Sequence, residues 1–369
     1  MNILLVNDFE KNGGAETVFN EQFKLLKSKN INVYKYVYQS SKINALSYIF
    51  NIKALIGLLR FVRKNEINVV WIHNFYHLLS PSILAIKYFS DVKIIYTAHD
   101  FHLVCANPSF QFFEQKNGYN FKRFTFKDLL TKRLDRRGAV YSTLRKVQWF
   151  LNYKLLKLHR NIDVVTAPST FLLGKIETVH KNVKLLRNPL IKPLEASFKV
   201  EYDDRLSLLY IGRLSDDKGV LEFLDQVENS KYIKDIIIVG DGPQYEILKS
   251  RFKNNFIIKF VGRIENTEIS NYILQSDLLF LSSLWYENAP MTILEAAQYK
   301  KQILLNDIGS LSCFGRQVGN ACYFNMEVRN VDEVLSQLVN RKFVVNLNNR
   351  EFCYDKYFND INSILNCVG

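Results

Sequence analysis

Short apolar runs alternate with longer amphipathic stretches along the whole chain. In the first half, runs rich in Val, Ile and Leu occupy residues 3–7, 33–38, 69–73, 93–97, 163–167 and 183–186. The pattern begins again after Asn188-Pro189, with runs at residues 207–212, 236–240, 257–261, 277–281 and 302–305. Strands that are apolar along their whole length are buried on both faces, which is typical of parallel sheets covered by helices.

The pattern predicts an α/β protein with two doubly wound, Rossmann-like parallel-sheet domains that face each other across a cleft. A chain of 369 residues is long enough for two domains. We place the first domain at residues 1–190 and the second at 191–350, and we expect a helix over residues 351–369. The cleft between such domains is the expected place for a binding site.

Composition narrows the class of protein. With 48% hydrophobic and 23% charged residues, and only 15 Gly and 7 Pro, the chain is neither disordered nor collagen-like. Five cysteines without a CxxC pair favour reduced thiols. The first residues enter an apolar run at once, without the pattern of a secretion signal, and the longest uncharged stretch, residues 67–86, carries many polar side chains. We therefore expect a cytoplasmic protein.

Positive charge is concentrated in the first half. Residues 1–195 carry 30 Lys and Arg against 13 Asp and Glu, whereas residues 196–369 carry 19 against 23. From Lys122 to Arg160 there are twelve basic residues and two acidic ones, interleaved with Phe124, Phe126, Tyr141, Trp149, Phe150 and Tyr153. A solvated helix face, an anionic lipid surface and nucleic acid all remain open as partners of this segment. Aromatic rings beside basic side chains favour the lipid surface.

Two turns could approach phosphate groups. Gly13 and Gly14 follow the first predicted strand and open a helix, where backbone N–H groups favour an anion; a simple turn is the alternative. Arg213 and Lys218 follow the first strand of the second half. A guanidinium fork and a movable ammonium suit a diphosphate, and these fixed cations would offset its charge because the sequence contains no D-x-D pair for a metal.

A pair of glutamates is the sharpest motif. Glu287 lies in a predicted loop and Glu295 falls in the helix that follows, with Pro290 expected in the first turn of that helix. A carboxylate can accept from two neighbouring hydroxyls, so one Glu could hold a sugar and the other a ribose. The backbone of Gly262, Arg263 and Ile264, at the exit of another predicted strand, could read the edge of a base.

In the first half, His99 and Asp100 follow a predicted strand, and His73 occupies the equivalent position after the preceding one. Such positions lie at the carboxyl edge of a parallel sheet and face a cleft. A lone histidine is usually a satisfied hydrogen-bonding residue, so His99, which has a neighbouring carboxylate, is the better candidate for a functional role.

Taken together, these motifs resemble those of the family-four retaining glycosyltransferases, which have the two-domain GT-B fold. The resemblance spans nearly the whole chain and depends on the glycine turn at 13–16, the loop 97–100, Ala167-Pro168-Ser169, Asn188-Pro189, Gly212-Arg213 with Lys218-Gly219, the turn 240–243, and the spacing of Glu287 and Glu295. It implies transfer of a sugar from a nucleotide sugar with retention of configuration, without a metal or other cofactor. It also implies that the final helix returns to the first domain.

The resemblance implies a role for each motif. Arg213 and Lys218 would hold the diphosphate, Glu295 the ribose and Glu287 the donor sugar, with His99 near the reacting carbon. Gly14 would approach the phosphates from the opposite domain on closure. Asn288, Ala289 and Met291 would line the same nucleotide-sugar site, although many relatives have Gly-rich residues after the first Glu, and Pro290 has no N–H to give.

We therefore expect a hexosyltransferase that uses UDP- or GDP-sugars and a polyprenyl-linked saccharide in surface polysaccharide synthesis, such as O-antigen, capsule or exopolysaccharide. It would be peripheral on the inner face of the cell membrane, docked through the segment from Lys122 to Arg160. Two alternatives stay open: a GT-B nucleotide-sugar epimerase, and a non-enzymatic basic module that binds membrane or nucleic acid. The sequence leaves the donor sugar, its base, the acceptor and the oligomeric state undetermined.

Overall fold

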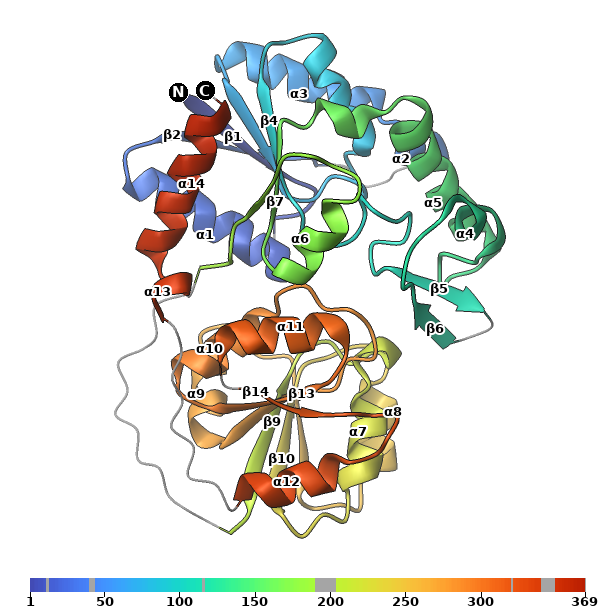
Figure 1. Ribbon diagram of the computed structural model, residues 1–369, viewed down its shortest axis with the longest axis vertical. Coiled ribbons are helices and arrows are strands. Elements are labelled where there is room, and N and C mark those ends of the chain that lie inside the picture. The colour runs from blue at the N-terminus through green and yellow to red at the C-terminus, as the bar shows by residue number, and fades with distance from the viewer. Residues whose placement is uncertain are drawn as a thin grey trace. The chain divides into compact units, whose positions relative to one another are not determined.

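The protein is described by a computed structural model, which covers residues 1–10, 13–39, 44–114, 117–189, 204–319, 321–339 and 349–368. It divides into two compact units (Figure 1). Unit 1 comprises Met1–Pro189 and Phe352–Gly369, and unit 2 comprises Leu190–Glu351. The sequence also predicts a connector through Lys192-Pro193, which lies outside the described residues.

Unit 1 contains a six-stranded parallel sheet in the order β2-β1-β3-β4-β7-β8. Its strands are β1 Asn2–Asn7, β2 Asn32–Val37, β3 Val69–Ile72, β4 Lys93–Thr97, β7 Val164–Ala167 and β8 Val183–Leu185. An antiparallel hairpin of β5 Gln111–Glu114 and β6 Asn117–Asn120 follows β4 in sequence. All six sheet strands were predicted within about two residues of these bounds, but the hairpin was not.

Helices flank the sheet of unit 1, and others lie beside the hairpin (Figure 1). They are α1 Gly14–Ser28, α2 Ala45–Ile49, α3 Ile52–Lys64, α4 Phe126–Thr131, α5 Ala139–Trp149, α6 Thr170–Ile176, α13 Asn349–Phe352 at the junction of the units, and α14 Tyr354–Val368. Shorter 3-10 segments are η1 Pro81–Tyr88 and η3 Leu158–Asn161, and α5 continues as the π-helix η2 Phe150–Leu155.

The last helix, α14, completes the core of unit 1. Its residues Tyr357, Ile361 and Leu365 pack in one apolar cluster with strand residues such as Ile3 and Trp71. The i, i+4, i+8 spacing places these three side chains on one face of the helix. In Figure 1 α14, drawn in red, lies beside α1.

Unit 2 contains a second six-stranded parallel sheet, in the order β11-β10-β9-β12-β13-β14. Its strands are β9 Leu206–Ile211, β10 Ile233–Val239, β11 Ile258–Gly262, β12 Leu278–Leu281, β13 Gln302–Asn306 and β14 Ala321–Phe324. Its helices are η4 Asp216–Lys218, α7 Val220–Val227, α8 Tyr245–Arg251, α9 Ile269–Gln275, α10 Met291–Gln298, α11 Gly309–Val318 and α12 Val331–Val339. The edge strand β14 was not predicted, and β10 begins three residues earlier than expected.

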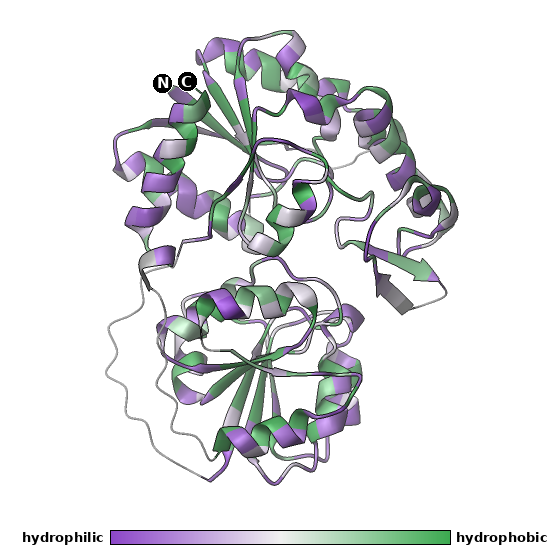
Figure 2. Cartoon of the chain, in the orientation of Figure 1, coloured by the Kyte–Doolittle hydropathy of each residue, from purple (hydrophilic) through white to green (hydrophobic). Residues whose placement is uncertain are grey.

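The central strands of both sheets are apolar on both faces, as Figure 2 shows in green. Ile3 to Val6 of β1 have no exposed surface, and Leu208 and Leu209 of β9 are equally buried. Burial on both faces requires helices on both sides of each sheet. The predicted α/β class with two doubly wound parallel sheets is therefore confirmed.

Candidate functional site

The strand order of unit 2 has its switch point, where doubly wound sheets have their ligand crevice, between β9 and β12. These strands are neighbours in the sheet, but the chain leaves β9 toward β10 and leaves β12 toward β13, on the other side. The loops at their carboxyl ends diverge, and ligands of doubly wound sheets bind at such a switch point. The loop after β9 carries Arg213 and Lys218, and the loop after β12 carries Glu287.

Gly219 allows these two loops to pack closely. Its φ is +62°, and a Cβ at this position would collide with the carbonyl oxygen of Ser282, in the loop after β12. A residue with a side chain would be strained by both the backbone angle and the contact. The hydroxyl of Ser282 donates to the carbonyl of Lys218 at 2.8 Å, which ties the loops together from the other side.

Lys218 and Glu287 form an ion pair in this crevice. Three donors converge on Oε1 of Glu287: Nζ of Lys218, Oγ of Ser283 at 2.6 Å and Nε1 of Trp285 at 2.9 Å. Nζ of Lys218 also lies 4.9 Å from the centre of the Trp285 ring, in cation–π range. The ion-paired side chains are only 18% and 15% exposed. The candidate phosphate ligand and the candidate sugar ligand are thus one connected group.

Glu295 lies on α10, downstream of this cluster. Its Oε2 atom is buried and accepts no hydrogen bond from the part of the chain that the structure describes. Burial raises the pKa of the Glu295 carboxyl from 4.5 to about 7. An unsatisfied buried acceptor is costly unless a ligand supplies a donor, so this carboxylate is suited to accept from a hydroxyl.

Pro290 takes a slightly different position from the expected one. It is the N-cap residue, with φ −60° and ψ 120°, and the helix begins at Met291 rather than at Pro290. The extended ψ angle turns the chain out of the loop and into α10. Glu287 remains in the loop, as predicted, and Asn288 and Ala289 form the half-buried connection to the helix.

The other predicted residues of unit 2 lie at strand ends. Arg213 is exposed just beyond β9, and its carbonyl accepts from the Tyr210 hydroxyl at 2.9 Å. Gly262 ends β11 with φ +83°, and its carbonyl accepts from the N–H of Gly240 at 2.8 Å, so this glycine also has a structural role. Arg263 is exposed and Ile264 half-buried beyond it. The ligand roles of these residues remain predictions.

The switch point of unit 1 lies between β1 and β3. The chain leaves β1 toward β2 and leaves β3 toward β4, on the opposite side. The carboxylate of Asp8, after β1, accepts from the N–H groups of His77, Leu78 and Leu79 at 2.8–2.9 Å. Burial raises the pKa of Asp8 to about 6 despite these bonds. Asp8 therefore connects the loops that follow β1 and β3.

His99 has a partner that the sequence did not indicate. Its Nε2 lies 2.9 Å from Nδ1 of His73, whereas the neighbouring Asp100 accepts from the Tyr76 hydroxyl and from the N–H of His102. Burial lowers the pKa of His99 to about 4, so its imidazole is neutral at pH 7. The available signal was the position of both histidines immediately after neighbouring strands.

Gly13 and Gly14 open α1. Gly13 is the N-cap residue and makes no side-chain cap, and Gly14 is the first residue of the helix. A Cβ at Gly14 would meet no protein atom within 4 Å. The packing of the described residues does not require glycine there, in contrast to Gly219, and the approach of a phosphate to Gly14 remains a prediction.

The basic segment from Lys122 to Arg160 forms α4, α5 and the π-helix. Several apolar side chains are exposed on these elements, among them Phe126 at 57%, Leu130 at 65%, Phe150 at 40% and Leu155 at 64%. We call these four residues the apolar patch. The aromatic rings interleaved with the basic residues favoured a lipid surface as the partner, but two of these rings are not on the surface. Trp149 and Tyr153 are buried and hydrogen-bond to His102.

Some of the positive charge is also neutralised within the fold. The buried carboxylate of Asp135 accepts from Arg137 and Arg145, which lowers its pKa to about 2. In the described part of the chain no helix is long and apolar enough to cross a membrane, and no three His, Cys, Asp or Glu side chains are grouped to hold a metal. All five cysteines are free thiols.

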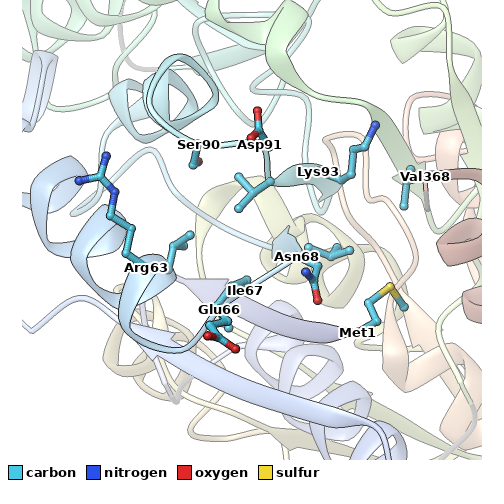
Figure 3. A pocket seen from close by; sticks show the side chains of 12 residues that line it. Met1, Arg63, Glu66, Ile67, Asn68, Ser90, Asp91, Lys93 and Val368 are labelled. Atoms are coloured by element: carbon cyan, nitrogen blue, oxygen red, sulfur yellow. The ribbon is translucent and has the colours of Figure 1, made fainter.

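A hollow of about 390 Å³ lies at the amino ends of the strands of the unit 1 sheet (Figure 3). Its lining includes Asn68, which precedes β3, and Val92 and Lys93 at the start of β4. It is therefore at the amino ends of the strands, whereas ligands of doubly wound sheets bind at the carboxyl ends. None of the predicted site residues lines it.

Comparison with known protein families gives a match within unit 2. Residues 193–316 match the family "Glycosyl transferases group 1". A Bacillus subtilis protein named as a teichuronic acid biosynthesis glycosyltransferase, TuaC, is 30% identical over 115 residues, which is 31% of this chain and 28% of TuaC. The match thus spans less than a third of that relative.

A Campylobacter jejuni protein is 27% identical over 165 residues, which is 41% of this chain and 44% of the relative. It is named as a GalNAc-α-(1->4)-GalNAc-α-(1->3)-diNAcBac-PP-undecaprenol α-1,4-N-acetyl-D-galactosaminyltransferase.

Solved structures share the fold over almost the whole chain. The lipopolysaccharide outer core galactosyltransferase WaaB aligns with a TM-score of 0.64 at 14% identity, covering 99% of both chains. Anabaena HepE in complex with UDP and glucose gives the same three values. At this identity the likeness shows the fold, which is GT-B. Residues 193–316 thus match the group 1 glycosyl transferases, and the chain as a whole shares the GT-B fold.

Proposed function

We propose that the protein transfers a sugar from a nucleotide sugar to a lipid-linked saccharide, with retention of configuration and without a metal ion, in the synthesis of a surface polysaccharide. The observation that carries this proposal is the cluster of Lys218, Glu287 and Trp285 at the switch point of unit 2. It joins a cation suited to a diphosphate with a carboxylate suited to sugar hydroxyls.

In unit 2, different residues bind different parts of the nucleotide sugar. Lys218 and Arg213 hold the diphosphate and stabilise the charge that builds on it as the sugar leaves. Glu287 accepts from hydroxyls of the donor sugar through Oε2, because the three protein donors contact Oε1. Glu295, with its buried acceptor, takes the ribose hydroxyls. The backbone of Gly262, Arg263 and Ile264 contacts the base, and Asn288, Ala289 and Met291 line the sugar.

Unit 1 supplies the acceptor side of the reaction. Gly14 lets a phosphate approach the first turn of α1, and His99 lies beside the reacting sugar. The basic segment with its apolar patch rests on anionic lipid, which would bring a polyprenyl-linked acceptor to the enzyme. Support for this acceptor class comes from the relative named for an undecaprenol-linked substrate, and support for a uridine donor from the neighbour that binds UDP and glucose.

The test is a panel of UDP- and GDP-sugars with a polyprenyl-linked saccharide, followed by analysis of the anomeric configuration of the product. We expect transfer that a chelator does not diminish. Arg213→Ala and Glu295→Ala should each lose most of the activity, whereas substitution of the exposed Glu246 by Ala should change little. Full activity in both site variants contradicts the site, and an inverted product contradicts retention.

The same assay separates the epimerase alternative. An epimerase converts the nucleotide sugar without an acceptor, so a new nucleotide sugar formed from donor alone would contradict transferase function. A basic binding module would bind neither UDP nor GDP in a calorimeter. We expect measurable binding of one of these nucleotides, weakened at least about tenfold by Glu295→Ala, because the variant removes the carboxylate that accepts charge-assisted hydrogen bonds from the ribose hydroxyls.

A further inference from the structure

The histidine pair of unit 1 is the feature that the proposed roles leave unexplained. His73 follows β3 and His99 follows β4, and these strands are neighbours in the sheet. The two rings are nearly parallel and meet edge to edge, with their centroids 5.1 Å apart at an interplanar angle of 18°. Nδ1 of His73 faces Nε2 of His99 at 2.9 Å, a hydrogen-bond distance that requires one of these nitrogens to donate and the other to accept.

Both imidazoles are neutral at pH 7. Burial lowers the pKa of His99 to about 4, and burial together with the neighbouring His99 ring holds the pKa of His73 well below its ordinary value. Each ring therefore carries one proton, and the shared hydrogen bond links the positions of the two protons.

The surroundings of His73 decide which nitrogen donates. His73 has no exposed surface, and its Nε2 is buried with no hydrogen-bond partner in the described part of the chain. A proton on Nε2 would be a buried donor without an acceptor, an arrangement that folded proteins avoid. The proton of His73 is therefore on Nδ1 and is donated to Nε2 of His99. The single proton of His99 is then on its Nδ1.

We propose that His73 is a positioning residue: its Nδ1–H fixes the ring of His99 and keeps the His99 proton on Nδ1. His99 then enters the reaction as a neutral hydrogen-bond donor through Nδ1, suited to an oxygen of the donor sugar, and not as a base at that atom. This inference rests on the proposed function, in which His99 lies beside the reacting sugar.

Two substitutions separate positioning from packing. In His73→Asn the side-chain amide can place an N–H near the position of the imidazole Nδ1, whereas His73→Leu fills the site without a donor. We expect His73→Asn to keep kcat within about threefold and His73→Leu to lose at least about tenfold, with little change of KM for the nucleotide sugar. A packing role reverses this order, because Leu suits a buried site beside Phe19 better than Asn. That order would overturn the proposal.

A second readout needs no turnover. Nitrogen NMR of the full-length protein with labelled histidine should show His99 protonated on Nδ1 in the wild type and in His73→Asn. In His73→Leu we expect a mixture of tautomers. A proton on Nε2 of His99 in the wild type, or an unchanged His99 spectrum in His73→Leu, overturns the proposal. If the wild type transfers no sugar to any acceptor, the proposed function fails, while the tautomer measurement still decides the role of His73.

Discussion

Lys218 and Glu287 are 69 residues apart in sequence, yet they form an ion pair at the crevice between β9 and β12. The pairing arises because the sheet places the first and fourth strands of unit 2 side by side. Under the proposed function, a nucleotide sugar that binds there would share Lys218 with Glu287. The pair would then link recognition of the diphosphate to the orientation of the Glu287 carboxylate, which is proposed to hold the sugar.

Replacement of Lys218 by Met should reduce kcat/KM by about 100-fold or more. The variant keeps most of the length of the side chain but removes the charge proposed to stabilise the leaving diphosphate, and it leaves Glu287 without its cation. Transfer rates at several donor concentrations measure the effect. The exposed Lys253, replaced by Met, serves as the control. Equal activity of Lys218→Met and Lys253→Met would contradict a role of Lys218 at the diphosphate.

Trp285 should orient Glu287 and Lys218 together. Trp285→Phe keeps an aromatic face for the ammonium but removes the Nε1–H bond to Glu287, so we expect a loss of about tenfold in kcat/KM. Trp285→Leu also removes the cation–π contact and should lose several times more. Steady-state kinetics with the same donor compare the two variants. A Leu variant as active as the Phe variant would show that the aromatic face contributes nothing.

The raised pKa of Glu295 predicts a pH-dependent stability of the ligand-free protein. The unfolded carboxyl titrates near 4.5, so between that pH and about 7 the folded state holds a proton that the unfolded chain has lost. Stability therefore falls as pH rises through this window, by no more than about 3 kcal/mol. Glu295→Gln removes this loss. Urea unfolding at about pH 5 and about pH 8 compares the wild type with the variant, since the other titrating groups are common to both.

If the stability of the wild type falls between about pH 5 and about pH 8 by no more than that of Glu295→Gln, the Glu295 carboxyl is not protonated in the folded protein. Replacement of the exposed Glu246 by Gln is the matched control, and it should leave the wild-type pH dependence unchanged.

Gly14→Ala should reduce activity without reducing stability. The new methyl group meets no protein atom within 4 Å, and Ala favours a helix by about 0.5–1 kcal/mol over Gly. It would, however, stand where a phosphate approaches the backbone. Gly174→Ala on α6 is the matched control, because a methyl group at this glycine would also meet no protein atom within 4 Å. If both variants are fully active, no ligand approaches Gly14 closely.

The apolar patch should contribute to membrane binding. Phe126→Ser and Leu130→Ser should each weaken binding to vesicles rich in anionic lipid by about fivefold, since each removes about 1 kcal/mol of partial apolar burial. Phe256→Ser, at a side chain of unit 2 that is 91% exposed, is the control. Vesicle sedimentation at low and high salt measures the apolar and the electrostatic contributions to binding. Binding that salt abolishes and the Ser variants leave unchanged would assign it to charge alone.

The sequence predicted the strands well because a strand buried on both faces leaves a continuous apolar run, as in β1 and β9. It did not predict β14, whose four residues lie at the sheet edge and are mostly half-buried, nor the hairpin of β5 and β6. The candidate residues were found from their positions after strands. Their pairings were not, because the contacts of His73 with His99 and of Lys218 with Glu287 depend on strand order. Trp149 and Tyr153 were misassigned because a charged segment does not reveal which of its rings turn inward.

The position of α14 means that unit 2 is an insertion within the polypeptide of unit 1, since residues 352–368 complete a core that begins with β1. During synthesis, some 160 residues of unit 2 are made after the strands of the first sheet and before α14. At ordinary ribosomal rates this takes about 10–30 s. Throughout that interval the apolar face that α14 later covers is open to water and to other chains. A ribosome-bound chain of this protein is therefore expected to need a chaperone for its first sheet longer than for its second.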